Sequence, residues 1–528
     1  MAGVVAAGIL LSRLAGLVRE SVFAHFLGNS AAADAFKAGF RIPNILQNLF
    51  GEGVLSASFI PVYSRMLARG EREEAELLAW SVGTILALAV SLMALAGVLC
   101  APYLIAVIAP GFHGAKRELT VMLVRVLFPG AGLLVMSAWC LGVLNSHRRF
   151  FISYAAPVAW NLAIIGTLIY YGPRRSPSAL AIDIAWGAVA GAAAQIAVQL
   201  PATLRLVGRL RLDFRRTRAA LRTVFGNLGP VVAGRGVGQL SGYLDNLLAS
   251  LLPTGAVAAL NYAQVLYMLP VSLFGWSVAA SELPAMSQIQ GDRREFAAQL
   301  RDRIDAGLRQ IAFLVIPSAA AFLFIGDVLV ALFFQSGNFK RADAIYVWSV
   351  LAGTAVGLLA ITMGRLYNSA FYALGDTRTP LKFAAIRFTL TGALGYLCAI
   401  VLPPLLGVAP RWGVAGLTAS AGISGWVEFA LLRWGLGRRI GPTGPGRSLV
   451  QKLWAIALVA SASAVAAKLW IVPAAGPRLR ALVVIPIFGA VYLGLARAAG
   501  ITELERFLGY LMLRLGIRRR SGQYPPRT

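Results

Sequence analysis

Residues 9–27 read ILLSRLAGLVRESVFAHFL, an apolar stretch of membrane-spanning length that nevertheless carries charges. Three charged side chains lie within it, Arg13, Arg19 and Glu20. A lone Arg, Lys or Asp near the centre of a bilayer costs roughly 2.5–3.5 kcal/mol on insertion scales, so a chain that keeps several is expected to gather them around a water-filled cavity or a charged ligand. The following run adds four more charges: Asp34, Lys37, Arg41 and Glu52. We therefore predict a polar cavity beside the N-terminal helices.

The composition of the whole chain is that of a polytopic membrane protein. Its 528 residues are 58% hydrophobic and only 13% charged, and its mean hydropathy is +0.71. This leaves too little polar surface for a soluble globule. The first apolar run has no convincing small-residue cleavage site and carries charges that a signal peptide would not, so we expect it to be a structural segment.

Apolar runs of about 20 residues predict an all-α fold with about fourteen transmembrane helices. The predicted segments are 2–25, 37–63, 77–107, 119–145, 152–171, 178–203, 223–250, 257–286, 305–333, 343–374, 381–403, 411–437, 449–472 and 479–499. Lys and Arg concentrate in alternate loops and in the C-terminal tail, which predicts that both termini are cytoplasmic. The net charge of +27 mostly reflects this bias, so it indicates attraction to anionic lipid headgroups rather than to nucleic acid.

The sequence also repeats itself. Phe59-Ile-Pro61 corresponds to Glu282-Leu-Pro284, Asn145-Ser146 to Asn368-Ser369, and Pro157 to Pro380, all at the same spacing along the sequence. This spacing covers an even number of predicted helices, so the two halves share one orientation in the membrane. Parallel repeats on either side of a midplane site are typical of secondary transporters.

Other classes of protein are disfavoured by what the sequence lacks. It contains no GxxxxGK[ST] motif for binding ATP. The three histidines and three cysteines are scattered, with no metal-ligand spacing, and no cluster of acids marks an enzyme site. We therefore expect a protein that is not an enzyme, with no cofactor and no metal site, powered by an ion gradient or the membrane potential.

Several motifs resemble those of the MurJ (MviN) family of lipid II flippases, and the resemblance covers nearly the whole chain. The motifs are Ser12-Arg-Leu-Ala-Gly-Leu-Val-Arg-Glu20, Ala33-Asp-Ala-Phe36, Phe40-Arg-Ile-Pro-Asn44, Phe50-Gly-Glu-Gly53 and Asp376-Thr-Arg-Thr-Pro380. The resemblance implies the fold of the multidrug/oligosaccharidyl-lipid/polysaccharide (MOP) superfamily. It implies an N-lobe over 1–222, a C-lobe over 223–440, and a final helix pair with a basic tail over 441–528. Between the lobes it implies a central cationic cavity that opens alternately to each side, and beside the last two helices a groove for a polyprenyl tail.

The substrate-binding residues are assigned by the same resemblance. They are Arg13, Arg19 and Arg365, with Asp34 and Glu52 as matching acids. Arginine suits the task because a guanidinium binds a pyrophosphate or carboxylate with paired donors and stays charged at cellular pH. Arg19 and Glu20 are neighbours along a helix and are expected to point in different directions, so that Glu20 need not neutralise Arg19.

Each of these residues also has a structural interpretation. Arg13 and Arg19 are alternatively snorkelling residues near a helix end. Arg41 is a further candidate for binding the substrate, but it precedes Pro43 and is equally well interfacial. For Arg365 the alternative is a structural ion pair with Asp245 or Glu428. For Asp34 and Glu52 the alternative is that they only neutralise the cations.

The chain departs from the family pattern at two places. Gln47-Asn48 stands where the family usually has a basic pair, and Gln264-Val265 stands where an Asp-Arg pair typically follows Tyr-Ala. Two cavity cations are therefore missing. Arg235 on the seventh predicted helix is a candidate replacement, with snorkelling as the equal alternative.

The leading interpretation is a flippase for lipid II in a bacterial cytoplasmic (inner) membrane, with a role in peptidoglycan biosynthesis and cell shape. The alternatives are a flippase for another polyprenyl-linked glycan, an organic-cation antiporter resembling the MATE transporters, and a non-transporting cell-wall scaffold. The expected partners are lipid II or a similar polyprenyl-pyrophosphate glycan, membrane lipids and cell-wall synthesis enzymes, with no nucleic acid. A monomer is expected. The sequence does not identify the coupling ion, the resting conformation or the glycan.

Overall fold

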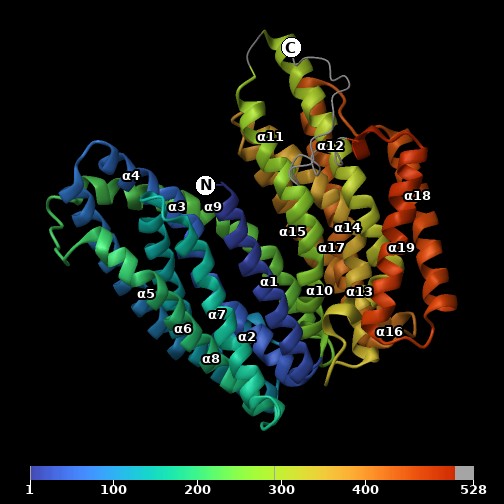
Figure 1. Cartoon of the computed structure of the whole chain (residues 1–528), viewed down its shortest axis with the longest axis horizontal. Helices are drawn as coiled ribbons and strands as arrows, with labels where there is room; N and C mark the ends of the chain where they lie inside the picture. The colour runs from blue at the N-terminus through green and yellow to red at the C-terminus, as the bar shows by residue number, and fades with distance from the viewer. Residues whose placement is uncertain (1, 290–291, 506–528) are drawn as a thin grey trace. The chain divides into compact units, whose positions relative to one another are not determined.

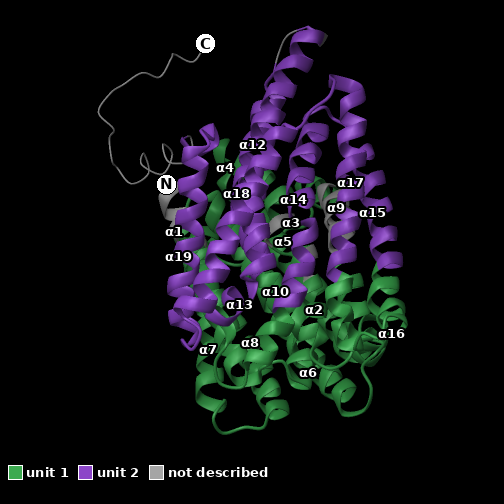
Figure 2. Cartoon of the chain, turned by 90° about the vertical axis from the view of Figure 1, so that its right-hand side faces the viewer, with its two compact units in different colours: residues 1–265, 333–347, 395–417 green, residues 266–332, 348–394, 418–528 purple. Residues whose placement is uncertain are grey.

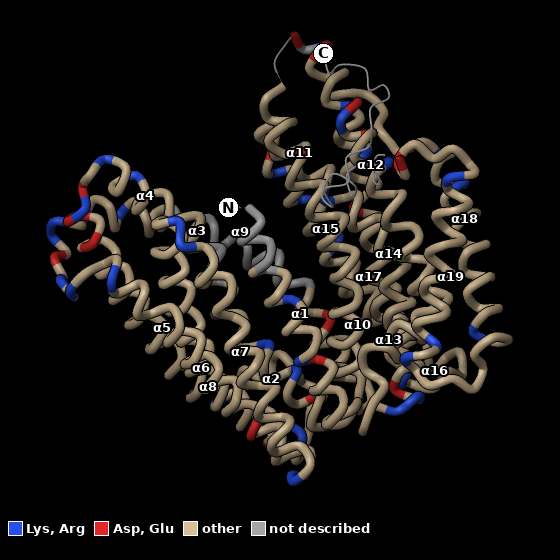
Figure 3. The backbone as a smooth tube through the Cα atoms, viewed as in Figure 1, with Lys and Arg blue, Asp and Glu red and all other residues tan. Residues whose placement is uncertain are grey.

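The computed structural model describes residues 2–289 and 292–505, and its regular elements there are all helices (Figure 1). Eleven of the described helices are long and apolar enough to cross a membrane. This confirms an all-α polytopic membrane fold, while the count of fourteen spans stays a prediction. Charged side chains gather in turns, as between α4 and α5, and are sparse along the middles of α5, α6 and α8 (Figure 3).

The chain forms two compact units (Figure 2). Unit 1 comprises residues 1–265, 333–347 and 395–417, and unit 2 comprises 266–332, 348–394 and 418–528. These units do not test the predicted division into an N-lobe over 1–222, a C-lobe over 223–440 and a final helix pair over 441–528, which stays a prediction.

Unit 1 contains the N-terminal helices. They are α1 (Ala2–Leu27), α2 (Ala31–Phe50), α3 (Glu52–Ser58), α4 (Ile60–Ala68), α5 (Arg72–Ile108), α6 (Gly114–Ser146), α7 (Phe150–Tyr171), α8 (Pro177–Val207), α9 (Arg218–Ser250) and most of α10 (Ala256–Pro270). Unit 1 also contains the end of α13 (Gly326–Phe334), the start of α14 (Arg341–Ala373), the end of α15 (Arg378–Tyr396) and the start of α17 (Gly413–Ile440). Three short elements belong to it as well: α16 (Leu402–Leu405), η2 (Leu397–Val401) and η3 (Pro410–Trp412). The apolar core of this unit joins α4, α5 and α6 around Tyr63, Leu78 and Trp139, all buried.

The second predicted segment, 37–63, differs from the structure. Three helices replace one, with breaks at Gly51 and Phe59. Gly51 ends α2 in an extended conformation, and Pro61 stands in the first turn of α4, where a missing N–H costs nothing. Ser30 begins α2 by accepting a hydrogen bond from the Ala33 N–H at 3.2 Å.

Unit 2 contains the remaining long helices. They are η1 (Val271–Trp276), α11 (Ser277–Ser287), α12 (Arg293–Phe324), most of α13, most of α14, most of α15, most of α17, and the whole of α18 (Arg447–Ala466), η4 (Ala467–Ile471) and α19 (Pro477–Ala498). A Cβ on Gly357 would lie 2.3 Å from the Gly422 Cα, so α14 and α17 cross with their backbones in contact. Tyr492 on α19 donates a hydrogen bond to the Phe313 carbonyl of α12 at 2.8 Å, which docks the last helix on the unit.

Candidate functional site

A buried network of opposite charges joins α1 and α2 in unit 1. The Glu20 carboxylate accepts a hydrogen bond from Arg19 Nη2 at 2.7 Å through one oxygen and from Lys37 Nζ through the other. Glu20 and Lys37 are both buried. Two cations therefore share one carboxylate, which leaves a positive charge in excess. We call Arg19, Glu20 and Lys37 the first cluster.

The expectation that Glu20 leaves Arg19 unneutralised is wrong. Consecutive residues start on different faces of a helix, but the long Arg19 side chain reaches the neighbouring carboxylate at 2.7 Å. Because little water reaches these side chains, pairing is far cheaper than leaving either charge alone.

Aromatic rings support both cations of the first cluster. The Arg19 guanidinium lies 4.7 Å from the centroid of the Trp160 ring. Lys37 Nζ lies 4.2 Å from the Phe23 ring centroid and 5.5 Å from that of Tyr262. Ring faces attract cations most strongly where water is excluded, so these contacts fix the positions of the charges.

A cavity of about 270 Å³ adjoins Arg19. Its polar lining comes from five helices of unit 1: Ser12, Arg19, Gln47, Ser137, Asn161 and Gln195. Ser137 is held by hydrogen bonds to Gln199 Oε1 at 2.6 Å and from Gln195 Nε2 at 2.8 Å. Gln47, one of the departures from the family pattern, thus contributes a neutral amide to this polar wall.

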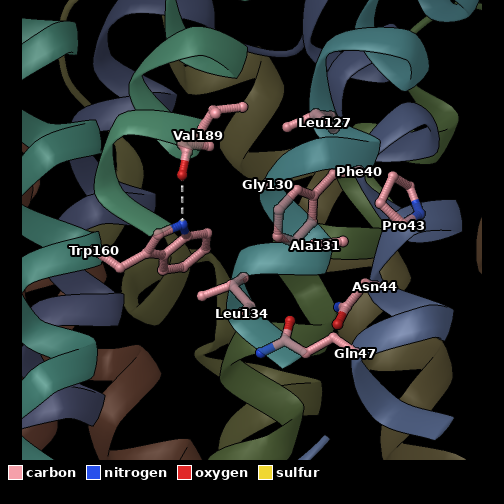
Figure 4. Close-up of a pocket in the computed structure, with 11 residues that line it drawn as sticks. Phe40, Pro43, Asn44, Gln47, Leu127, Gly130, Ala131, Leu134, Trp160 and Val189 are labelled. Carbon is pink, nitrogen blue, oxygen red and sulfur yellow. Dashed lines mark hydrogen bonds between the residues drawn. The ribbon is translucent and has the colours of Figure 1, made fainter. Parts of the chain in front are cut away.

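A second, apolar hollow lies next to this cavity and shares Gln47, Leu134 and Trp160 with it (Figure 4). Phe40, Pro43 and Val189 close it, and Trp160 is oriented by a hydrogen bond from its Nε1 to the Ala188 carbonyl at 3.0 Å. This hydrogen bond fixes the orientation of the Trp160 ring, whose face the Arg19 guanidinium contacts.

Asp34 lies apart from the first cluster. It accepts hydrogen bonds from Lys116 Nζ at 2.6 Å and from the backbone N–H groups of Gly255 and Ala258, each at 2.7 Å. The carboxylate therefore caps the N-terminus of α10, where the helix dipole favours negative charge. Its partner is Lys116 rather than one of the predicted arginines.

The structure describes the remaining predicted binding residues of unit 1 only in part. Arg13 is exposed on α1. Arg41 is partly buried, and its guanidinium lies 5.4 Å from the centroid of the Tyr243 ring. Glu52 and Arg235 belong to α3 and α9, but their side chains lie outside the described part of the structure.

Arg365 belongs to a comparable arrangement in unit 2. Its guanidinium lies 4.6 Å from the centroid of the Trp276 ring. The predicted alternative partner, Glu428, instead binds Arg387, with Nη1 and Oε2 3.0 Å apart. We call Arg365, Arg387 and Glu428 the second cluster. The electrostatic influence of both Arg387 and Glu428 reaches Arg365.

Two residues of these clusters were missed as binding candidates. Lys37 is one of the charges in the second apolar run, yet no motif assigns it a role. Arg387 interrupts the apolar run KFAAIRFTL at 382–390, and the cost of a charge there was the signal that could have found it.

Comparisons with known proteins agree on one family. The family model described as lipid II flippase MurJ matches residues 23–476. The lipid II flippase MurJ of Burkholderia cenocepacia is 32% identical over 439 residues, covering 81% of this chain and 82% of that protein. The probable lipid II flippase MurJ of Rhizobium meliloti is 31% identical, over 80% of this chain and 78% of that protein.

Solved structures share the fold. A lipid II flippase MurJ in an inward closed conformation superposes with a TM-score of 0.75 at 20% identity, covering 93% of this chain and 97% of that one. An inward-facing multidrug resistance MATE family transporter of the MOP superfamily gives 0.64 at 16% identity, over 81% and 95% of the two chains.

Proposed function

The chain belongs to the MurJ family of lipid II flippases, and from this premise we propose that it moves lipid II across the membrane. The cargo is the undecaprenyl-pyrophosphate-linked precursor of peptidoglycan, carried from the inner to the outer leaflet by alternating access. The protein spans the bacterial cytoplasmic membrane with both termini in the cytoplasm, and it works as a monomer.

The first cluster is the observation that carries this proposal. It holds two cations and one carboxylate among apolar helices, with an aromatic ring under each cation. An excess of positive charge in such surroundings attracts an anionic headgroup, and a guanidinium can bind a pyrophosphate through paired donors. The same excess repels an organic cation, which argues against a drug antiporter.

The polar cavity beside Arg19 suits the uncharged part of the same headgroup. Its hydroxyl and amide groups can donate to and accept from sugar hydroxyls and acetamido groups. Asn161 supports this use, since its Oδ1 is buried and accepts no hydrogen bond from any described residue.

Contacts within unit 1 join the end of α1 to α10 and to the residues just before α14. Asn338 donates from its backbone N–H to the His25 carbonyl at 2.7 Å, and Tyr262 donates to the Gly28 carbonyl at 2.8 Å. Gly28 has φ +57, and a Cβ there would lie 2.7 Å from the Asn338 carbonyl oxygen. We propose that these contacts and the Asp34 cap form a gate that opens to release the headgroup.

The polyprenyl tail requires an apolar path. Helices α18 and α19 pack against each other. Together with the η4 turn that follows α18, they expose large apolar side chains, among them Leu469, Trp470 and Leu482. We propose that they guide the tail along the lipid, because a charged cavity is a costly environment for a hydrocarbon chain. The motive force is an ion gradient or the membrane potential, and cell-wall synthesis enzymes are the partners that use the product.

The experiment is rescue of a strain depleted of its own lipid II flippase, together with flipping of labelled lipid II by the purified chain in vesicles. Arg19→Ala is expected to abolish both, and Arg19→Lys to retain a fraction, because it keeps the charge but loses the paired donors. Arg174→Ala, an exposed loop arginine, is the matched control and is expected to behave as wild type.

The outcome also separates the alternatives. Rescue and flipping by the wild-type protein, with both lost in Arg19→Ala, support the proposal. Flipping of a different polyprenyl-linked glycan without rescue would replace lipid II as the cargo. Efflux of organic cations, or rescue without any flipping activity, would overturn the proposal in favour of an antiporter or a scaffold.

A further inference from the structure

We propose that the loop between α8 and α9 is a docking surface for anionic phospholipids, which holds the start of α9 at the surface of the membrane. The loop reads GRLRLDFRRT over residues 208–217, with cations and large apolar residues in alternation. We call its exposed cationic and apolar residues the loop patch: Arg209, Leu210, Arg211, Leu212, Phe214 and Arg215. The inference needs only that the chain lies in a membrane, and it does not rest on lipid II as the cargo.

Both ends of the loop are anchored in the apolar core of unit 1. Val207 at the end of α8 is fully buried, and Leu221 in the first turn of α9 belongs to the same core. Gly208 turns the chain at the end of α8 with φ +69, and a Cβ there would lie 3.3 Å from Glu76 Oε2. The loop is therefore short and fixed at each end.

The middle of the loop is bound to the start of α5. Arg216 forms ion pairs with Glu73 at 3.2 Å and with Glu74 at 3.3 Å. The hydroxyl oxygen of Thr217, which is buried, lies 3.3 Å from that of Ser81. Charged residues of the α4–α5 turn and of this loop thus meet at one end of the unit (Figure 3). Because α5 and α8 are both long and apolar enough to cross a membrane, the loop lies where these helices leave the membrane.

The cations of the loop patch are available to an external anion. Arg209, Arg211 and Arg215 are exposed, and none of them forms an ion pair with a described residue. The one acid of the loop is directed at the backbone: Asp213 Oδ1 accepts hydrogen bonds from the N–H groups of Arg215 and Arg216, each at 3.0 Å. A guanidinium binds phosphate oxygens with paired donors, so three such groups suit phosphate headgroups.

Large apolar side chains alternate with these cations. Leu210 is 61% exposed, Leu212 45% and Phe214 46%. Single exposed apolar residues are normal on a protein surface, but three in one short loop form a patch. Cations alone attract any anion, whereas cations interleaved with apolar side chains match the boundary between lipid headgroups and acyl chains. The combination therefore favours an anionic phospholipid over a soluble anion or an acidic protein.

The competing interpretation is a general attraction of this basic end of the protein to an anionic surface, with no site in the loop. The α4–α5 turn provides the matched comparison. It carries three exposed arginines at the same end of unit 1, Arg65, Arg69 and Arg72, and no large apolar residue between them is exposed. Replacing all three with glutamine removes the same charge as the triple substitution in the loop. A general attraction predicts equal losses, and a loop site predicts a loss from the loop alone.

The test uses the purified full-length protein in nanodiscs of phosphatidylcholine alone or of equal parts phosphatidylcholine and phosphatidylglycerol. The three native cysteines are replaced with alanine, and Phe214→Cys carries a bimane dye whose rings stand in for the phenyl ring. Quenching by a nitroxide-labelled phospholipid measures contact of the dye with lipid. Ala68→Cys on the α4–α5 turn is the exposed control position. The thermal midpoint of each variant is recorded.

We expect quenching at position 214 to rise severalfold with phosphatidylglycerol and quenching at position 68 to change little. Each cation near an anionic surface contributes roughly a fivefold preference, so Arg209→Gln with Arg211→Gln and Arg215→Gln should abolish the rise. The thermal midpoint should stay unchanged, because these side chains are exposed. Leu210→Ser with Leu212→Ser should lower quenching in both lipid compositions. Added salt gives the same test without a substitution, since it screens exposed charges.

Several outcomes would overturn the inference. Equal quenching in both lipid compositions would mean that the loop patch contacts lipid without binding a charged headgroup. No quenching in either would mean that the loop stays in water, where an acidic protein is the better candidate partner. An equal loss in the triple variant of the α4–α5 turn would indicate a general attraction. A rise caused by added lipid II but not by phosphatidylglycerol would make the cargo the occupant.

Discussion

The two clusters have the same balance of charges but distribute those charges differently. Each contains two cations and one carboxylate, and a tryptophan ring lies beside one arginine of each: the Trp160 centroid is 4.7 Å from the Arg19 guanidinium and the Trp276 centroid 4.6 Å from that of Arg365. In the first cluster both cations reach the carboxylate. In the second, Glu428 is paired with Arg387, and Arg365 Nε has no hydrogen-bond acceptor among the described residues.

This difference predicts that the first cluster depends more strongly on its carboxylate than the second cluster does. Loss of Glu20 removes a contact of both Arg19 and Lys37, whereas loss of Glu428 removes a contact of Arg387 alone. The following substitutions test that contrast, from the largest expected effect to the smallest.

Glu20→Leu is expected to be the most damaging change. It leaves Arg19 and Lys37 without their carboxylate in a buried setting, at a cost of about 3–5 kcal/mol. The measurement is the thermal midpoint in detergent, together with abundance in the membrane. A thermal midpoint equal to that of the wild type would mean that water reaches the first cluster freely. The first cluster would then not depend on its carboxylate more than the second cluster does.

Asp34→Asn is expected to destabilise the protein by about 1.5–3 kcal/mol. The carboxylate receives charge-assisted hydrogen bonds from Lys116 and from the start of α10, and the amide keeps only part of them. Protection of the Gly255 and Ala258 amides from hydrogen exchange should fall. Unchanged protection would show that the cap contributes little to the closed end of unit 1.

Glu428→Gln should cost less than the loss of Glu20, about 1–2 kcal/mol, a value between those of exposed and buried pairs. The reason is that its partner Arg387 keeps 26% of its side-chain surface exposed. Comparing the thermal midpoints of Glu428→Gln and Glu20→Gln gives the contrast directly. A larger loss for Glu428→Gln would reverse our ranking of the two clusters.

The smallest effect concerns pH at the α14–α15 turn. Asp376 accepts hydrogen bonds from Thr379 and from Arg439, and these hold the pKa of its carboxyl below the usual 3.8. Because the folded-state pKa is lowered, the stabilisation is present above pH 3.8 and is lost as the pH falls through the folded value. The wild-type thermal midpoint should therefore drop more steeply below about pH 4 than that of Asp376→Asn. Parallel curves would contradict this.

Much of the fold could be predicted from the sequence because long apolar runs leave few alternatives in a membrane. Every predicted segment overlaps a described helix. The break of 37–63 into three helices was not predicted, because Gly51 and Pro61 lie within one apolar run of membrane-spanning length. The π turn η1 was also missed, because an extra residue in a helical turn leaves the hydropathy pattern unchanged.

The contacts of the candidate binding residues were harder to predict, for a geometric reason. Motifs pointed to Arg19 and Arg365, but they could not show which acid each cation meets. Glu20 reaches its own neighbour Arg19, and Asp34 reaches Lys116 on another helix. Arg387 and Glu428 are far apart in the sequence, and only the crossing of the helices pairs them.

The π turn over Val271–Trp276 gives the second cluster an unusual sensitivity to insertions and deletions. One residue turns an α-helix by about 100°. Removing a single residue from this turn would let α10 run straight into α11 as a regular helix, yet it would rotate Trp276 away from Arg365. A related chain could therefore gain or lose the contact between Trp276 and Arg365 through the insertion or deletion of one residue, without any substitution in the second cluster.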